Sequence, residues 1–296
     1  MSSATSLLSV DRLTVQHRGA TRPAVREVSL SVEPGQVLGI VGESGSGKTT
    51  LLRAWLGLIA PTSGSVKWGA DELSSLRASA LAQRRAMIQP VFQDPSAALD
   101  PRLTIAASLS EPFEIHGRPV SPSVLERLLA DVQLSTEVLG QAPRTLSAGQ
   151  RQRVAIARAL ALEPKVLLLD EPVSALDVSV QAQILELLRQ LRDRRGLTMV
   201  LVSHDLDVVR ALASDVVVLF AGRVVERGSV SAVTTTPLHP YTRALLGTDL
   251  RPAIDRPIAE EPGCAFRARC PFATPACSLT PPLPEAAHAA ACVMVK

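Results

Sequence analysis

Hydrophobic and polar residues alternate along the beginning of the chain. Apolar positions alternate with polar ones in Leu7–Gln16 and Ala24–Val32, which predicts two strands around a turn. Gln36–Val41 is largely apolar, as expected of a strand buried on both faces. A glycine-rich turn follows, and a helix is then predicted from Lys48 to about Leu58.

The pattern changes to a helical period in the middle of the chain. After a second β-rich piece that ends at Met87–Phe92, apolar residues recur at helical spacing in three segments, Leu103–Ile115, Pro122–Val132 and Gly149–Leu162. We expect these helices to form an inserted subdomain over about residues 94–161.

Strands and helices then alternate. Strands are predicted at Val166–Asp170 and Thr198–Ser203, helices at Val178–Arg195 and Asp205–Ala213, and a hairpin around Ala221-Gly222. Alternation of this kind favours an α/β fold whose largely parallel sheet is covered on both faces.

Composition divides the chain at about residue 247. Beyond it the sequence is rich in Pro, Ala and Cys with little periodicity, so we expect one large domain over 1–247 and a loop-rich extension over 248–296. The longest apolar runs, such as Val216–Phe220, are far too short to span a bilayer, and the first residues do not resemble a secretory signal. We expect a cytoplasmic chain, and a main body without cysteine fits a reducing compartment.

The charge pattern argues against nucleic acid as a partner. The net charge is +3 and the pI is near 8.9, but the arginines are scattered among acids and form no basic block.

The segment after the strand Gln36–Val41 has the pattern of a phosphate-binding loop. Its glycines allow the backbone to curl so that N–H groups point at phosphate oxygens, and the following helix start adds positive potential. We expect Lys48 to neutralise β and γ oxygens and Thr49 to bind Mg²⁺. The candidate nucleotide-binding residues are Gly42, Glu43, Ser44, Gly45, Ser46, Gly47, Lys48, Thr49 and Thr50.

Two acids, Asp170 and Glu171, follow the apolar strand that begins at Val166. Ligands of open α/β sheets bind where strands end, so Asp170 is a candidate partner of Mg²⁺ and Glu171 a candidate general base toward water. Strands also commonly end in solvated acids, but two acids in a chain with a phosphate loop favour function.

Two further polar residues occupy junctions of the predicted fold. Gln93 lies between the β-rich piece and the helical segments, where its amide can reach Mg²⁺ or the attacking water. His204 ends a predicted strand, where an imidazole can hold the γ-phosphate. A loop glutamine or a strand-end histidine alone is usually only a satisfied polar residue, and the constellation is what favours function.

Leu146-Ser147-Ala148-Gly149-Gln150 is the most informative stretch. Ser147 is a candidate N-cap for the following helix, and a capped helix start is also an anion site that can bind the γ-phosphate held by a second subunit.

Together these motifs resemble an ABC-transporter ATPase over roughly residues 7–246. The resemblance implies a P-loop NTPase (RecA-like) fold with an antiparallel β subdomain, in which Glu171, His204 and Gln93 are catalytic and Thr49, Gln93 and Asp170 hold Mg²⁺. It also implies two ATP molecules bound between two ATPase subunits. The residues expected to touch the partner's ATP are Ser147, Ala148, Gly149, Gln150 and Asp177.

Finer motifs resemble the oligopeptide/dipeptide/nickel importer ATPases. They are FQDPSAALDPR from Phe92, EPVSALD from Glu171 and PLHPYTRALL from Pro237, and GQRQRVAIARAL from Gly149 is similar to the second of the two paired ATPases. The implied partners are a second, different ATPase subunit, two transmembrane permease subunits and an extracytoplasmic substrate-binding protein. The chain is then peripheral on the cytoplasmic side of the membrane, and the cargo is a di- or oligopeptide.

Two positions depart from the family pattern. Ala148 stands where the signature usually has glycine, which would cost about 1 kcal/mol if the backbone there has positive φ. His17 stands where an aromatic residue normally stacks on adenine.

Four cysteines, Cys264, Cys270, Cys277 and Cys292, are confined to the Pro-rich extension. Their spacing fits no CxxC zinc pattern, and unrelated thiols, a structural metal and an iron–sulfur cluster are the alternatives. A segment with little hydrophobic core needs a cross-link or a bound metal to become ordered. The resembled ATPases carry a similar cysteine set that can hold a [4Fe–4S] cluster, and this resemblance favours the cluster.

Two other functions remain open. One is the same ATPase role with nickel or a metal chelate as cargo. The other is a non-transport ABC protein of a soluble or nucleic-acid complex, although the chain has neither the long coiled coil nor the fused second ATPase unit typical of such proteins.

Overall fold

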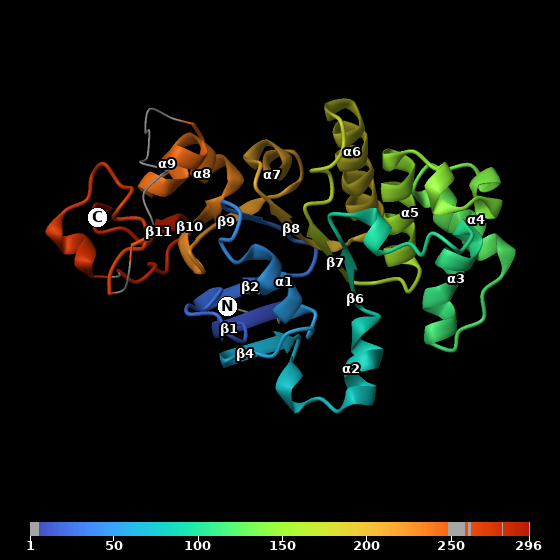
Figure 1. The fold of residues 1–296 in the computed structure, drawn as a ribbon, viewed down its shortest axis with the longest axis horizontal. Helices are drawn as coiled ribbons and strands as arrows, with labels where there is room; N and C mark the ends of the chain where they lie inside the picture. The colour runs from blue at the N-terminus through green and yellow to red at the C-terminus, as the bar shows by residue number, and fades with distance from the viewer. Residues whose placement is uncertain (1–5, 248–257, 260–261, 280, 296) are drawn as a thin grey trace. The chain divides into compact units, whose positions relative to one another are not determined.

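The computed structural model describes residues 6–247, 258–259, 262–279 and 281–295, which form two compact units (Figure 1). The first unit comprises the chain up to Glu33, Val37–Ser74 and the residues from Leu201 onward. The second comprises Pro34–Gln36 and Ser75–Val200.

An antiparallel sheet forms one part of the first unit. Its strands lie in the order β2-β1-β4-β5. Their bounds are Leu8–Val15 for β1, Val25–Val32 for β2, Ser63–Trp68 for β4 and Asp71–Glu72 for β5. Leu8 lies opposite Val32 on one side and Trp68 on the other, and the strand buries its apolar residues Leu8, Val10, Leu13 and Val15.

The phosphate-loop strand β3 (Val37–Val41) belongs to a second sheet in this unit and is buried along its whole length. It pairs in parallel with β9 (Asp215–Phe220), which forms a hairpin with β10 (Arg223–Ser229). The two-residue strand β11 (Ala289–Ala290) pairs with β10. The C-terminal extension is thereby joined to the edge of this sheet.

Four α-helices are found among the described residues of the first unit. They are α1 (Lys48–Trp55), α7 (Leu206–Leu212), α8 (Val230–Thr235) and α9 (Pro240–Leu245). Gly39 of β3 lets α7 pack closely, because a Cβ there would lie 2.4 Å from Val209 Cγ1.

The second unit contains the strands that carry the acidic residues. β6 (Ile88–Val91) pairs in parallel with β7 (Val166–Asp170), and β8 (Thr198–Ser203), whose first three residues belong to this unit, follows β7 in the strand order. β7 is buried except at its last residue, Asp170. The helices α2 (Ala78–Arg85) and α6 (Val178–Arg195) also belong here.

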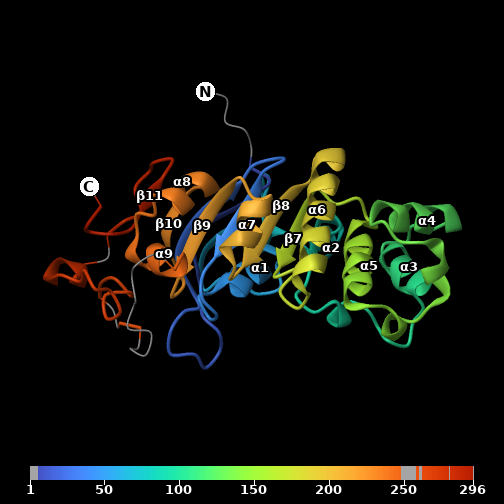
Figure 2. The same ribbon diagram turned by 90° about the horizontal axis from the view of Figure 1, so that it is seen from above.

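Three helices of the second unit pack on one another: α3 (Ile105–Ile115), α4 (Pro122–Asp131) and α5 (Ala148–Leu160) (Figure 2). Ile105 and Leu109 of α3, Leu129 of α4 and Val154 of α5 are fully buried. The predicted helical segments are confirmed, with ends that differ by a few residues.

Several short elements lie outside the sequence expectations. These are α2, α8, α9 and β11, which have between two and eight residues and too few positions to show a period. The strands β4 and β5 fall in the predicted second β-rich piece. The boundary expected at residues 247/248 borders residues 248–257, which lie outside the described residues, and it stays a prediction. Among the described residues, no helix combines the length and apolar character needed to cross a bilayer.

Candidate nucleotide site

The phosphate loop connects the buried strand β3 to helix α1 and depends on its glycines. Gly45 and Gly47 have φ of +78° and +106°, a region that L side chains rarely adopt. A Cβ on Gly47 would lie 2.2 Å from the Ala24 carbonyl oxygen. The loop can therefore keep this shape only with glycine at that position.

Lys48 lies over the loop that precedes it. Its Nζ donates to the carbonyl oxygens of Gly42 at 2.8 Å and Glu43 at 2.9 Å, and the residue is only 6% exposed. Ser46 is buried as well, and its Oγ has no hydrogen-bond partner among the described residues. Backbone amides at the start of α1 and this hydroxyl supply donors for an anion.

His17, the candidate adenine contact, lies beside the start of α1. Its Nε2 is 3.1 Å from Oγ1 of Thr50, and the imidazole is exposed to solvent. The structure thus places two of the predicted nucleotide-binding residues together, and stacking on adenine stays a prediction.

In the second unit, Gln93 and Glu171 are brought together. Gln93 Nε2 donates to Glu171 Oε2 at 3.2 Å and to Ser174 Oγ at 3.3 Å. Ser174 Oγ in turn donates to the Glu171 carbonyl at 3.2 Å. Glu171 has φ of +47°, a backbone conformation that costs about 1 kcal/mol or more for a residue with a side chain and is common at functional sites.

Ser147 caps helix α5 as predicted. Its Oγ accepts from the Gln150 N–H at 3.2 Å, and Gln150 Oε1 accepts from the Ser147 N–H at 2.9 Å, so both form a capping box. Ser147 is exposed. Helix starts of this kind can bind anions, and the predicted contact to a partner's phosphate stays a prediction.

Gly149 packs the start of α5 against the start of α6. A Cβ on Gly149 would lie 2.7 Å from Val180 Cγ1. The Val180 N–H donates to Asp177 Oδ1 at 3.0 Å, and Ser179 Oγ donates to the same oxygen at 2.7 Å. These bonds, that from Ser179 above all, lower the pKa of Asp177, which is exposed and ionised. The two segments predicted to touch a partner's ATP thus lie next to each other.

His204 lies in the first unit, between the end of β8 and the start of α7. It is exposed, and the next residue, Asp205, caps α7 by accepting from the Asp207 N–H at 2.8 Å. This position fits the predicted histidine contact to phosphate, which stays a prediction.

Comparison with known proteins agrees with these motifs. Residues 25–174 match the ABC transporter family, and residues 225–277 match the C-terminal region of oligopeptide/dipeptide transporters. The chain belongs to the ABC transporter family.

Curated relatives of this ABC ATPase match it over nearly its whole length. A putative peptide import ATP-binding protein of Brucella ovis is 44% identical, with 94% of this chain and 93% of the relative covered. The oligopeptide transport ATP-binding protein OppF of Escherichia coli is 42% identical, with 93% and 89% covered.

Solved structures confirm the fold. The dimeric post-hydrolysis structure of the ATP-binding cassette MJ0796 with ADP and Pi is 31% identical, has a TM-score of 0.68, and covers 75% of this chain and 98% of its own. CbiO1 of Clostridium perfringens is 28% identical with a TM-score of 0.70, covering 78% and 92%. The α/β fold of an ABC ATPase is therefore established.

One departure from the family pattern causes no backbone strain in this ABC ATPase. Ala148 is the first residue of α5 and is not among the non-glycine residues with positive φ. The steric penalty that glycine would avoid is therefore absent.

The four cysteines of the extension line one small cavity, of about 10 Å³. Burial raises the pKa of Cys264 and Cys270, and the other thiols raise that of Cys264 further. In the part of the chain that the structure describes, no set of three or more His, Cys, Asp or Glu residues is arranged to hold a metal ion. The [4Fe–4S] site expected from the resemblance is therefore not confirmed.

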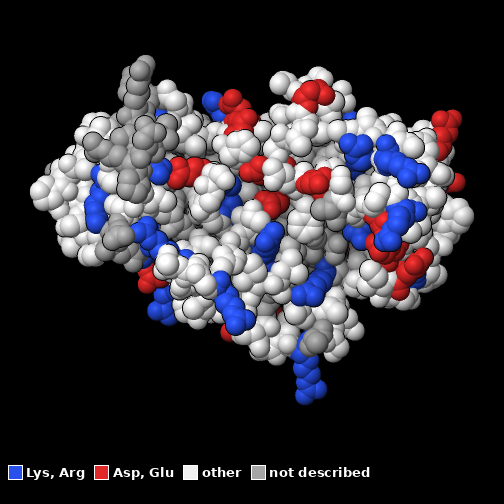
Figure 3. All heavy atoms as spheres, viewed as in Figure 1, with Lys and Arg blue, Asp and Glu red and all other residues white. Residues whose placement is uncertain are grey.

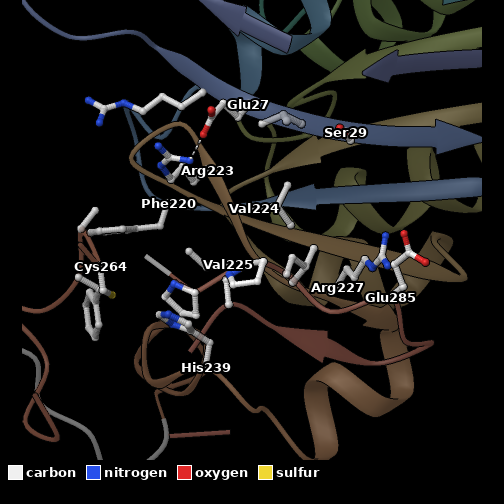
Figure 4. Close-up of a pocket in the computed structure, with 18 residues that line it drawn as sticks. Glu27, Ser29, Phe220, Arg223, Val224, Val225, Arg227, His239, Cys264 and Glu285 are labelled. Atoms are coloured by element: carbon white, nitrogen blue, oxygen red, sulfur yellow. Dashed lines mark hydrogen bonds and ion pairs between the residues drawn. The ribbon is translucent and has the colours of Figure 1, made fainter. Parts of the chain in front are cut away.

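A larger cavity of about 530 Å³ lies beside this cysteine set, and Figure 4 shows its lining. β2, the β9–β10 hairpin and the extension contribute to it, and Arg223 pairs with Glu27 at 2.8 Å. His239 and Cys264 line both cavities.

Two residues that touch the phosphate loop were not found from the sequence. Tyr241 and Arg269 both contact Glu43, from positions 198 and 226 residues away. Tyr241 belongs to the PLHPYTRALL motif, but no local pattern marks Arg269.

Proposed function

We propose that this chain is the ATP-hydrolysing subunit of an importer for di- and oligopeptides. The observation that carries the proposal is the hydrogen bond from Gln93 to Glu171, because it joins a polar residue next to the helical subdomain to the candidate general base. Movement of the segment that carries Gln93 then alters the hydrogen bonding of Glu171, which is a direct physical link between a docked partner and hydrolysis.

The remaining roles follow the motifs. Gly42–Thr50 binds the triphosphate, with Lys48 on the β and γ oxygens, while Thr49, Gln93 and Asp170 are the candidates for Mg²⁺. Glu171 accepts a proton from the attacking water, and His204 contacts the γ-phosphate. His17 lies against the adenine.

A second ATPase subunit completes the site. The capping box of Ser147 and Gln150 and the exposed Asp177 supply the surfaces that meet the nucleotide held by the partner. We infer a heterodimer of this chain with a related ATPase, as in importers that have two paired ATPases.

The cargo and the membrane partners come from the resemblance to the peptide importers. Relatives named for peptide import and oligopeptide transport support peptide cargo. Two permease subunits and an extracytoplasmic binding protein are the partners that the resemblance to these importers implies. The chain then lies on the cytoplasmic face of the membrane through the permeases. Basic and acidic side chains are interspersed on the face in Figure 3.

Co-purification tests the proposal. The chain should be recovered with membrane permease subunits, and the assembly should hydrolyse ATP faster when a loaded peptide-binding protein is added. Recovery with RNA or with a soluble complex would favour the non-transport alternative, and stimulation by nickel-loaded binding protein alone would change the cargo.

We also propose that the four cysteines hold a [4Fe–4S] cluster. Four thiolates are the donor set of such a cluster, and His239 supports the fit. His239 Nδ1 accepts from the Tyr241 N–H at 3.0 Å, which leaves the proton of the neutral ring on Nε2. That atom is buried, has no hydrogen-bond partner among the described residues, and belongs to a residue lining the same cavity as the thiols. Hydrogen-bond donors next to cysteine ligands stabilise the thiolate charge.

Metal analysis tests this second proposal. Protein purified without oxygen should contain about four iron and four sulfide per chain and absorb broadly in the visible range. Cys264→Ser combined with Cys270→Ser should abolish both. A colourless, iron-free wild-type protein contradicts the cluster, and stoichiometric zinc would replace it with a structural metal.

A further inference from the structure

The C-terminal extension reaches the phosphate loop through one ion pair. Arg269 Nη1 lies 3.2 Å from Oε2 and 3.4 Å from Oε1 of Glu43, the second residue of the loop. The two side chains are 15% and 34% exposed. A partly buried, charge-assisted pair is stronger than an ion pair in open solvent, because water screens it less.

Aromatic neighbours hold the Arg269 side chain in place independently of its contact with the loop. The guanidinium lies 5.9 Å from the centre of the Phe220 ring, in cation–π range. Phe266 packs edge-on against the same ring at 5.4 Å, and its carbonyl accepts from the Arg269 N–H at 2.9 Å. Little side-chain entropy is therefore lost when Arg269 pairs with Glu43.

Tyr241 holds the backbone of the same loop residue. Its hydroxyl accepts from the Glu43 N–H at 2.7 Å, and its ring packs 4.5 Å from that of Phe220. Burial raises the pKa of Tyr241, so the hydroxyl stays neutral. Side chain and backbone of Glu43 are thus both fixed from outside the loop.

Glu43 in turn shapes the part of the loop that receives phosphate. Its carbonyl accepts from Lys48 Nζ at 2.9 Å and from the Ser46 N–H at 3.1 Å. Without a counter-charge, a carboxylate in this loop would repel the triphosphate. Arg269 supplies that counter-charge.

We propose that Arg269 is a positioning residue for ATP binding. It neutralises and orients Glu43, so that the loop keeps the conformation in which Lys48 and the loop amides bind phosphate. The proposal deepens the function proposed above and depends on Gly42–Thr50 being the triphosphate site. It gives the C-terminal extension a direct part in nucleotide affinity.

Hydrogen exchange of the nucleotide-free protein tests the positioning. Arg269→Gln should speed exchange of the Glu43 and Ser46 amides about tenfold. Arg227→Gln is the matched control, because Arg227 Nη2 also joins the extension to the sheet, through the Pro284 carbonyl at 3.1 Å, but does not touch the loop. Exchange at the loop should be unchanged in that control.

ATP affinity tests whether the charge of Arg269 offsets that of Glu43. Arg269→Gln should raise the Kd for ATP and the KM about tenfold with kcat nearly unchanged, and Arg269→Lys should recover part of the loss. Adding Glu43→Gln to Arg269→Gln should bring the Kd back to within about threefold of wild type, because the unpaired carboxylate is then gone.

Two results would overturn the proposal. One is wild-type loop exchange and wild-type ATP affinity in Arg269→Gln, and the other is an equal effect of Arg227→Gln, which would indicate a general loosening of the extension. Failure of the wild-type protein to bind ATP would instead refute the proposed function. Amide hydrogen exchange of the nucleotide-free protein would still decide whether Arg269 positions the loop.

Discussion

Gln93 Nε2 donates to Glu171 Oε2 at 3.2 Å, which joins the end of one β segment to the residue that follows strand β7. Ser174 closes this arrangement by bonding both residues. The candidate base is therefore held in place, at a positive φ, by a glutamine on a separate segment. Hydrolysis should depend on this small network rather than on Glu171 alone.

Glu171→Gln should lower ATP hydrolysis by a factor of about 100 or more, because an amide cannot accept the proton of the attacking water. ATP affinity should stay close to wild type, since the phosphate loop is unaltered. Glu163→Gln is the matched control, because Glu163 also has positive φ, +53°, and is exposed. Equal hydrolysis by Glu171→Gln and the wild-type assembly would contradict the assignment.

Ser147→Asp separates the cap from the contact to phosphate. Aspartate is an equally good N-cap, so the melting temperature without nucleotide should not fall, whereas its charge should repel the partner's γ-phosphate. ATP-dependent association with the ATPase partner, measured by light scattering, should be lost. Ser229→Asp changes the equivalent cap of α8, where Ser229 Oγ accepts from the Ala232 N–H at 3.2 Å, and association should persist.

Gly149→Ala should destabilise the protein by about 1–2 kcal/mol, because the new methyl would lie 2.7 Å from Val180 Cγ1. Val180→Ala in the same protein should restore much of the stability, as measured by urea unfolding. Gly140→Ala is the control, since a Cβ there has no neighbour within 4 Å. If the two substitutions changed the free energy of unfolding additively, the starts of α5 and α6 would not be in steric contact.

His239 should make the folded state sensitive to mild acid. Burial lowers its pKa from 6.5 to about 4, so the unfolded chain binds a proton that the folded chain excludes. The contribution of the neutral His239 ring to the free energy of unfolding is complete above pH 6.5 and is lost as the pH falls toward 4. Between pH 7 and pH 5 the wild type should lose about 2 kcal/mol more than His239→Asn, which keeps an acceptor for the Tyr241 N–H.

Chemical unfolding at several pH values checks this difference. His116→Asn, which alters a partly exposed histidine at the end of α3, should retain the wild-type acid sensitivity. A loss of stability that is the same in wild type and His239→Asn would contradict a buried neutral imidazole.

Much of the fold was predictable because its signals are local. The glycines of Gly42–Lys48, the cap at Ser147 and the apolar strand before Asp170 each express backbone chemistry within a few residues. The short elements β11, α8 and α9 could not be predicted, since tertiary packing rather than periodicity determines them.

The candidate site residues could be identified from the sequence as a set of motifs, but the contacts between them could not. The bond between Gln93 and Glu171 joins residues 78 apart, and that between Arg269 and Glu43 joins residues 226 apart. Neither pairing leaves a pattern in a single sequence. The convergence of the four cysteines on one cavity likewise depends on how a Pro-rich segment folds.

A transport measurement decides whether ATP hydrolysis by this chain drives peptide uptake. The full assembly, reconstituted in vesicles with its binding protein, should accumulate a labelled peptide only with ATP and Mg²⁺. Replacing the wild-type chain by Glu171→Gln should abolish accumulation while ATP binding persists. Undiminished accumulation with that variant, or accumulation without ATP, would contradict the account.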